Sequence, residues 1–296
     1  MLKYLQCVLG VLLSIGLSFA VLAEPQLKLS ASDVRQGQQL WLELDADTAP
    51  GPFKAQLAGQ EVELFERDGH FFCFIGLAAD QKTGGYTLRI VDAQKHVITQ
   101  QKIEVLPVSR SSQNIRYAPP KMTAEQEKKL AQEESLVDVA RSARSPQAFW
   151  QGAFSAPVPH KVSAVYGIRR YLNGKYNGYH GGVDFLSPMG FAVKAPAAAK
   201  VALARYFAPY NSNGNTVFLD HGLGVTSVYL HLSKILVKEG QMVKKGEAVG
   251  LIGTTGRSTG PHLHWGVYLN GKNTDALNWI QFTQKWPMSE AVSEAS

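Results

Sequence analysis

Cysteine is scarce in this chain, because only Cys7 and Cys73 occur among its 296 residues. If the N-terminal segment is removed during export, Cys73 has no intramolecular partner, which excludes a fold stabilised by disulfides within the chain. The mature protein must then be held together by the packing of its hydrophobic core. Cys73 lies in the apolar stretch FFCFIG, so we expect a buried structural thiol rather than a reactive one.

Long hydrophobic runs are also missing, apart from one near the N-terminus. The segment MLKYLQCVLGVLLSIGLSFAVLAEPQ contains an early lysine, an apolar stretch and small residues up to Ala23. This pattern predicts a secretory signal peptide over residues 1–23, cleaved after Ala23. The alternative is an uncleaved membrane anchor, although Gly16 and Ser18 interrupt the run and leave it short for a bilayer span. We expect no transmembrane segment after signal removal and a periplasmic location, with secretion or membrane anchoring as alternatives.

An acidic surface is not expected either, since the net charge is +6. From residue 151 onward the chain has 14 Lys and Arg against 7 Asp and Glu. A basic exported domain suits an anionic cell-wall polymer, an anionic lipid surface or a nucleic acid, and charge alone does not choose among them. With 45% hydrophobic and 18% charged residues, the composition is that of an ordinary globular protein.

Residues 24–107 have the pattern of a small all-β domain. Leu40 and Leu42 alternate with Trp41 and other residues, and an Asp-Gly pair at Asp68 separates two apolar runs. An Asp-Gly pair in this position is a strong hairpin signal. Short strands at this spacing predict a β-sandwich of immunoglobulin-like type.

Residues 108–147 change in character and predict a linker that contains one helix. The stretch PVSRSSQNIRYAPP is rich in Ser, Pro and Asn, as linkers are. Thr123 and Gln126 then form a capping-box pattern at the start of an amphipathic segment. We expect this helix to space the domains or to pack between them, and a partner-binding helix is an alternative without support in the sequence.

Residues 148–283 are glycine-rich and predict an antiparallel β domain with little helix, followed by a C-terminal tail over residues 284–296. The stretches GNTVFLDHG, GVTSVYLHL and GPHLHWGVYLNG are short β segments separated by turn signals. The predicted fold class of the whole chain is therefore mainly β.

Two histidines of this last domain lie two residues apart on one predicted strand. In GPHLHWGV, His262 and His264 alternate with Leu263 and Trp265, the period of a pleated strand. Both imidazoles therefore point from the same face of the strand, with their backbones about 7 Å apart.

Further polar residues of the same domain complete a candidate metal site. The segment YHGGVDF places His180 and Asp184 four residues apart, and His231 ends the alternating run VYLHLS. Two imidazoles and one carboxylate suit zinc with one coordination position left open, where water becomes a nucleophile near neutral pH. The remaining histidines would move protons and stabilise an oxyanion. Spacing alone does not tell which histidine of the pair 262 and 264 binds the metal.

These motifs, together with VYGIRR and GTTGRSTGPHLHW, resemble those of the LytM/lysostaphin-type zinc metallopeptidases, peptidase family M23. The resemblance covers roughly residues 158–280, and its motifs are specific in combination. It implies a LytM-type peptidase domain with zinc as cofactor. The metal ligands that it implies are His180, Asp184 and His264, and the implied catalytic residues are His231 and His262.

The resemblance implies hydrolysis of peptide crosslinks in bacterial peptidoglycan, with the stem peptides as substrate and no nucleic-acid partner. A regulatory protein, or inhibition by the N-terminal domain within the same chain, is a further expectation. One alternative is a catalytically silent module of the same fold that binds and regulates another cell-wall hydrolase; the complete His/Asp set disfavours it. A biotinyl- or lipoyl-type carrier is disfavoured because no modifiable Lys motif occurs. The simplest alternative is that the five residues are unrelated and satisfied by local hydrogen bonds.

Overall fold

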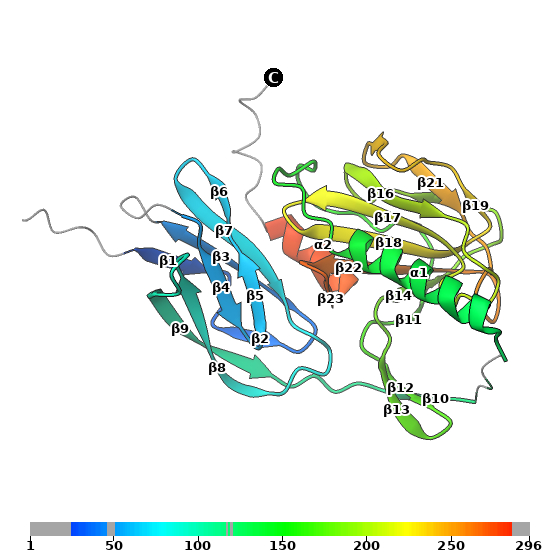
Figure 1. Ribbon diagram of the computed structural model, residues 1–296, viewed down its shortest axis with the longest axis horizontal. Coiled ribbons are helices and arrows are strands. Elements are labelled where there is room, and N and C mark those ends of the chain that lie inside the picture. Colours follow the sequence, from blue (N-terminus) through cyan, green and yellow to red (C-terminus); the bar gives the residue numbers. More distant parts are fainter. Residues whose placement is uncertain (1–24, 46–50, 117, 119–120, 286–296) are drawn as a thin grey trace, which may run out of the picture.

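The computed structural model describes residues 25–45, 51–116, 118 and 121–285. The predicted signal peptide over residues 1–23 and nearly all of the predicted tail lie outside the described residues. The rest forms an N-terminal β-sandwich beside a larger β domain that carries the two helices (Figure 1). The predicted mainly β class is confirmed. None of the helices within these ranges is long and apolar enough to cross a bilayer.

Two sheets build the N-terminal part. The first contains β1 (Gln26–Leu29), β3 (Gln39–Asp45), β7 (His70–Gly76) and β6 (Phe65–Arg67), in that order. The second contains β2 (Asp33–Arg35), β9 (Val97–Leu106), β8 (Gly84–Val91), β4 (Lys54–Leu57) and β5 (Gln60–Glu63). Alternate side chains of both sheets meet in one core, which includes Leu40, Leu42 and Phe53. The two layers agree with the predicted sandwich, and its immunoglobulin-like type stays a prediction.

Two local predictions for this part are confirmed. Strands β6 and β7 form a hairpin in which Arg67 pairs with His70, and Asp68 and Gly69 adopt φ angles of 51° and 80°. Both angles are positive, as the tight Asp-Gly turn requires. Cys73 is fully buried, and burial raises the pKa of its thiol to about 12, so it is a structural and unreactive residue.

The larger domain is built on a curved antiparallel sheet of eight strands. Its order is β11 (Val162–Ala164), β14 (Val183–Leu186), β22 (His262–Leu269), β18 (Val225–Leu232), β17 (Asn215–Gly222), β16 (Ala199–Arg205) and β20 (Met242–Val243), with β23 (Lys272–Thr274) paired to β22. A second small sheet contains β15 (Ala192–Lys194), β21 (Ala248–Leu251) and β19 (Lys234–Ile235). The last element is α2 (Ala276–Lys285). This arrangement is the antiparallel β domain that the sequence predicts.

The segment between the two parts is more structured than a plain linker. Its residues 112–115 form β10 (Ser112–Ile115), which pairs in parallel with β12 (Arg169–Leu172); β12 in turn pairs with β13 (Lys175–Tyr179). The predicted helix is confirmed as α1 (Ala124–Arg141), including its capping box. In that box Gln126 N–H donates to Thr123 Oγ1 at 3.3 Å, and Thr123 N–H donates to Gln126 Oε1 at 2.9 Å.

Helix α1 lies on one face of the large sheet, across β16, β17 and β18 (Figure 1). Ala140 of the helix belongs to a small core with Phe218 and Val228 of the sheet. Val228 pairs with Gly266. Leu230, the next residue of β18 on the same face as Val228, pairs with His264. Because directly opposed residues point to the same side of a sheet, the helix covers the face that also carries His264.

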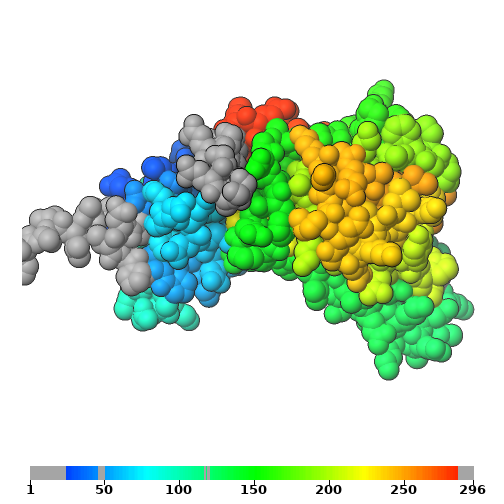
Figure 2. All heavy atoms as spheres, turned by 90° about the horizontal axis from the view of Figure 1, so that it is seen from above, coloured from blue at the N-terminus to red at the C-terminus, as the bar shows by residue number. Residues whose placement is uncertain are grey.

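The sandwich and the larger domain share buried contacts. Phe72 and Phe74 of the sandwich belong to the same core cluster as Leu269 and Trp279. The rings of Phe74 and Trp279 meet edge to face with centroids 5.3 Å apart, and Asn270 Nδ2 donates to the Phe74 carbonyl at 2.7 Å. Seen from above, the blue and cyan N-terminal part lies directly against the rest of the molecule (Figure 2). The two parts therefore pack as one body.

Candidate metal centre and active site

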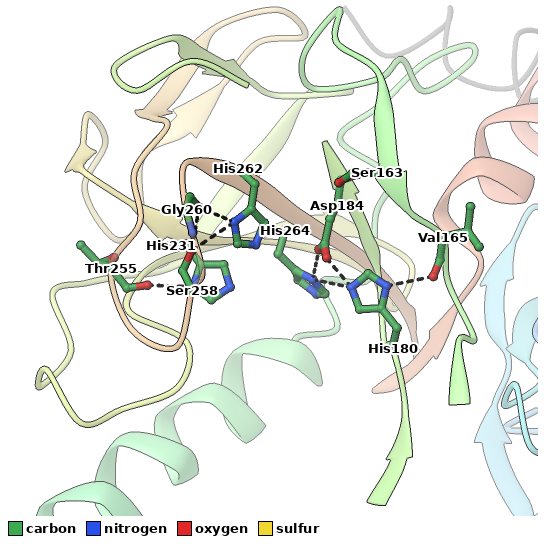
Figure 3. Close-up of polar contacts among 10 residues, drawn as sticks. All are labelled: Ser163, Val165, His180, Asp184, His231, Thr255, Ser258, Gly260, His262 and His264. Atoms are coloured by element: carbon green, nitrogen blue, oxygen red, sulfur yellow. Dashed lines mark hydrogen bonds and ion pairs between the residues drawn. The ribbon is translucent and has the colours of Figure 1, made fainter. Parts of the chain in front are cut away.

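Three side chains from two paired strands and the turn before them converge on one point (Figure 3). Asp184 on β14 is directly opposite His264 on β22, so both side chains leave the same face of the sheet. His180 reaches them from the start of the turn that connects β13 to β14. His180 Nε2 lies 3.0 Å from Asp184 Oδ1 and 3.0 Å from His264 Nδ1, and His264 Nδ1 lies 2.8 Å from Asp184 Oδ1.

Gly182 allows this close approach. A Cβ atom at this position would lie 2.4 Å from the Trp265 carbonyl oxygen and 2.7 Å from His264 Nε2. Both distances are shorter than van der Waals contact, and the first partner is backbone that has no room to move. The glycine therefore lets the turn that bears His180 lie against β22.

The hydrogen bonds of the trio leave lone pairs pointing inward. His180 Nδ1 lies 2.8 Å from the Val165 carbonyl oxygen, to which only an N–H donates, so Nε2 of a neutral ring carries the lone pair. That lone pair faces a second imidazole nitrogen and a carboxylate oxygen. Three acceptor atoms at such distances repel one another unless a cation or a proton lies between them.

The donor set fits zinc. Two nitrogens and one carboxylate oxygen are common zinc ligands, and ligand atoms about 2.0–2.1 Å from a tetrahedral ion lie about 3.3 Å apart. The observed separations of 2.8–3.0 Å are close to this value. Three protein ligands also leave the fourth position free, as catalytic zinc sites do.

Electrostatics keeps Asp184 and His264 in the protonation states that a metal requires. Burial by itself would raise the pKa of Asp184, but the adjacent imidazoles of His180 and His264 hold that pKa well below its ordinary value. Burial lowers the pKa of His264, against the opposing effect of Asp184. The site thus presents an ionised carboxylate and a neutral His264 imidazole at neutral pH.

Two further histidines stand beside the trio, with their rings 4.8 Å apart between centroids (Figure 3). His262 begins β22, and His231 lies near the end of β18 with its ring centroid 6.3 Å from that of His264. His231 Nδ1 lies 2.8 Å from the Thr255 carbonyl oxygen, and His262 Nδ1 lies 2.8 Å from the Gly260 carbonyl oxygen. Each Nδ1 therefore carries the proton, and each Nε2 has no hydrogen-bond partner within the described part of the chain.

His231 binds a proton less readily than a surface histidine does. Burial, helped by the neighbouring His264, lowers the pKa of His231 to about 4, against the opposing effect of the Thr255 carbonyl. At neutral pH the ring is therefore an uncharged base with an available Nε2 atom.

The structure brings together all five residues that the sequence singles out. It places His264 in the trio and His262 outside it, a distinction that the spacing of the two residues leaves open. Sequence reasoning missed the carbonyl acceptors at residues 165, 255 and 260, because any residue type supplies a carbonyl and no sequence signal marks them. It also missed Ser258, whose Oγ lies 3.1 Å from His262 Nδ1.

Comparisons with known proteins agree with this geometry. Residues 178–276 match the model of peptidase family M23. The chain is 44% identical over 98 residues to the peptidoglycan DD-endopeptidase ShyB of Vibrio cholerae, which covers 33% of this chain and 22% of that protein. An uncharacterized metalloprotease of Haemophilus influenzae is 49% identical over 98 residues, which cover 33% of this chain and 20% of that protein. The chain thus spans about a fifth of the length of these curated relatives.

A solved structure resembles the chain over more of its length. This protein of Pseudomonas aeruginosa, described as an M23 peptidase, has a TM-score of 0.60 and 30% sequence identity. The match covers 81% of this chain and 92% of that one. The similarity therefore includes much of the N-terminal part as well as the β domain with the histidines.

Proposed function

Because the chain belongs to peptidase family M23, we propose that it is a zinc-dependent endopeptidase that hydrolyses peptide crosslinks of bacterial peptidoglycan. The observation that carries the proposal is the convergence of His180, Asp184 and His264 with two further histidines directly beside them. A binding module would need neither a complete ligand set nor two rings with an available nitrogen. The catalytically silent alternative therefore becomes an outcome of the test below.

His180, Asp184 and His264 would hold the metal. When bound there, zinc supplies Lewis-acid polarisation of the scissile carbonyl and makes water acidic enough to act as a nucleophile near neutral pH. Asp184 contributes the one negative charge of the set, which partly neutralises the ion. The hydrogen bond from His180 to the Val165 carbonyl holds that ring in the orientation and tautomer that binding needs.

His231 and His262 would move protons. Each ring donates through Nδ1 to a backbone carbonyl, so Nε2 is the atom that accepts a proton from the attacking water or returns one to the leaving amine. After gaining a proton, a ring at this position also donates a hydrogen bond to the negative charge that develops on the carbonyl oxygen. Hydrogen bonds to backbone carbonyls hold both rings ready for this exchange.

The substrate class is proposed from the chemistry of the site and from the relatives. ShyB is named as a peptidoglycan DD-endopeptidase, which supports stem-peptide crosslinks as the target. Leu186 is directly opposite His262 on the neighbouring strand and is 58% exposed, so it offers an apolar contact next to the reacting bond. Such a contact suits the methyl group of an alanine in a stem peptide.

The proposed location follows from the substrate. Peptidoglycan lies outside the cytoplasm, and a periplasmic location agrees with the signal peptide expected over residues 1–23. The excess of basic residues after residue 151 suits an anionic wall polymer. No step in this reaction requires a nucleic acid or an organic cofactor.

A regulatory role for the N-terminal domain is a separate proposal. Its described contacts with the larger domain involve residues such as Asn270, Thr274 and Trp279, and not the five site residues. This arrangement favours an N-terminal domain that supports the fold of the larger domain over one that covers the site histidines. Loosening the interface by Phe74→Ala, or deleting residues 24–106, tests restraint directly: a rise in activity supports it, and equal or lower activity in both proteins contradicts it.

The experiment that tests the main proposal pairs zinc analysis with digestion of purified crosslinked peptidoglycan. We expect about one zinc per chain and new uncrosslinked stem peptides, which disappear with His231→Ala while zinc remains. His96→Ala, an exposed histidine of the sandwich, is the matched control and should change neither result. No zinc and no cleavage after metal reconstitution would instead support the silent regulatory module.

A further inference from the structure

A buried carboxylate on the linker helix lies at the start of a hydrogen-bond chain to the active site. Glu133 of α1 is only 8% exposed, although glutamate is seldom buried without partners. One of its oxygens, Oε1, accepts from the Ala208 backbone N–H at 3.1 Å, and Oε2 accepts from Asn211 Nδ2 at 2.8 Å. The helix is thereby fixed to the loop that precedes β17.

Asn211 connects Glu133 to the backbone of Asn213. Its side chain is 2% exposed, and both ends of its amide are used. While Nδ2 donates to Glu133, Oδ1 accepts from the Asn213 backbone N–H at 2.9 Å. The amide therefore has one allowed orientation, which Glu133 determines, because a carboxylate only accepts.

The loop in turn holds the backbone of His231. The His231 N–H donates to the Asn213 carbonyl oxygen at 3.1 Å. This contact matters because His231 has a φ angle of +64°, a left-handed conformation that residues with a Cβ atom seldom adopt. Thr255 holds the other side of the residue through its carbonyl contact with Nδ1. The ring orientation of His231 therefore depends on two loops, one of which is anchored to α1.

We propose that Glu133 is a positioning residue for His231. Through Asn211 and Asn213 it stabilises the left-handed backbone of His231 and thereby the direction of its Nε2 atom. The consequence for catalysis rests on the proposed function. In this account α1 is part of the peptidase machinery, although it precedes the region that matches the family model.

The hydrogen-bond chain can be tested by exchanging the carboxylate at position 133 with the amide at position 211. Glu133→Gln must present an NH2 group to one of two donors, Ala208 N–H or Asn211 Nδ2, and therefore breaks the hydrogen-bond chain. Asn211→Asp places two carboxylates against each other and also breaks it. In the double variant, a glutamine at position 133 donates to an aspartate at position 211 and accepts from Ala208 N–H, so every contact is restored. Glu134→Gln, on the exposed side of the same helix, is the control.

For each single variant we expect kcat to fall about tenfold, with KM and zinc content nearly unchanged, because a displaced proton carrier slows the reaction without weakening binding. The double variant should return to within about threefold of the wild-type kcat, and Glu134→Gln should behave as wild type. In 15N-histidine spectra the His231 signals, identified by their loss in His231→Ala, should shift in the single variants and return in the double variant.

The spectra separate this proposal from the proposed function, since they need no substrate. If the wild-type chain does not cut peptidoglycan but the His231 signals respond as described, the positioning survives and the proposed function fails. Unchanged signals and unchanged kcat in the single variants would overturn the positioning, as would a double variant no better than either single one. If Glu133→Gln does not fold, Asn211→Ala decides, because it keeps the contact between Glu133 and Ala208 N–H and removes the amide that joins Glu133 to Asn213.

Discussion

The two halves of the active site are built differently, although each contains one histidine of strand β22. In the metal half, His180, Asp184 and His264 point their ligand atoms at one another at 2.8–3.0 Å. In the half proposed to transfer protons, no hydrogen bond joins the rings of His231 and His262 within the described residues. His231 Nδ1 contacts the Thr255 carbonyl oxygen, whereas His262 Nδ1 contacts the Gly260 carbonyl oxygen and Ser258 Oγ. The difference teaches that converging acceptors need a cation or a proton between them, whereas a proton carrier needs one anchored nitrogen and one available nitrogen.

The largest expected effect comes from removing a member of the metal half. His264→Ala leaves two ligands and two open positions, so we expect zinc to be lost and peptidoglycan hydrolysis to fall below detection. His262→Ala is the matched variant, on the same face of the same strand, and should keep its zinc. Metal analysis after dialysis, together with the digestion assay, checks both; zinc retained by His264→Ala would place the metal elsewhere.

A variant of the other half should separate metal binding from turnover. His231→Ala leaves the three ligand atoms in place, so we expect about one zinc per chain. Turnover should fall by about 10²–10⁴-fold, the usual contribution of a general acid or base. The measurement is kcat on a soluble crosslinked muropeptide at saturating zinc. A wild-type rate would exclude His231 from proton transfer.

A third buried histidine shows that a low pKa alone does not make a catalyst. Burial in β17 lowers the pKa of His221 to about 4, but its two nitrogens are occupied, Nδ1 by the Ala198 carbonyl and Nε2 by Ser227 Oγ. The unfolded chain binds a proton at this residue below about pH 6.5, whereas the folded chain does so only below about pH 4. Stability should therefore decline as pH falls through this window, by about 3 kcal/mol from this residue.

Substituting His221→Gln should make the free energy of unfolding less dependent on pH between 7 and 4.5. Urea unfolding of both proteins in the presence of a chelator measures this, so that zinc release does not contribute. The exposed His96→Ala variant should keep the wild-type dependence. An equal decline in the wild type and His221→Gln would show that other groups dominate.

The smallest expected effect tests how strongly the second proton carrier is held. Ser258 Oγ lies 3.1 Å from His262 Nδ1, but the Gly260 carbonyl oxygen is closer, at 2.8 Å. We therefore expect Ser258→Ala to lower kcat by only about threefold, since one hydrogen bond of two remains. Steady-state kinetics at constant zinc checks this. A loss as large as that of His231→Ala would make Ser258 the main anchor of the ring.

Much of the fold was predictable because it depends on local patterns. The Asp-Gly turn, the capping box of Thr123 and Gln126, and the alternation around His262 and His264 act over a few residues, and each appears in the structure as expected. Strand β10 was not predictable, because its parallel partner β12 lies more than fifty residues later. The docking of the sandwich through Phe74 was missed for the same reason.

The amino-acid sequence by itself determined which side chains are candidates for the chemistry: four histidines and one aspartate, of which His262 and His264 share one face of a strand through its alternation. The spacing of the pair left open which histidine joins Asp184, and the tertiary structure gives the physical reason for His264, which is the register between β14 and β22. The tertiary structure alone decided that Glu133 lies buried beside the loop that holds His231. From the sequence, the helix that carries Glu133 was expected only to space the domains or to pack between them. Register and burial arise from contacts between distant segments, and those contacts exist only once the chain has packed.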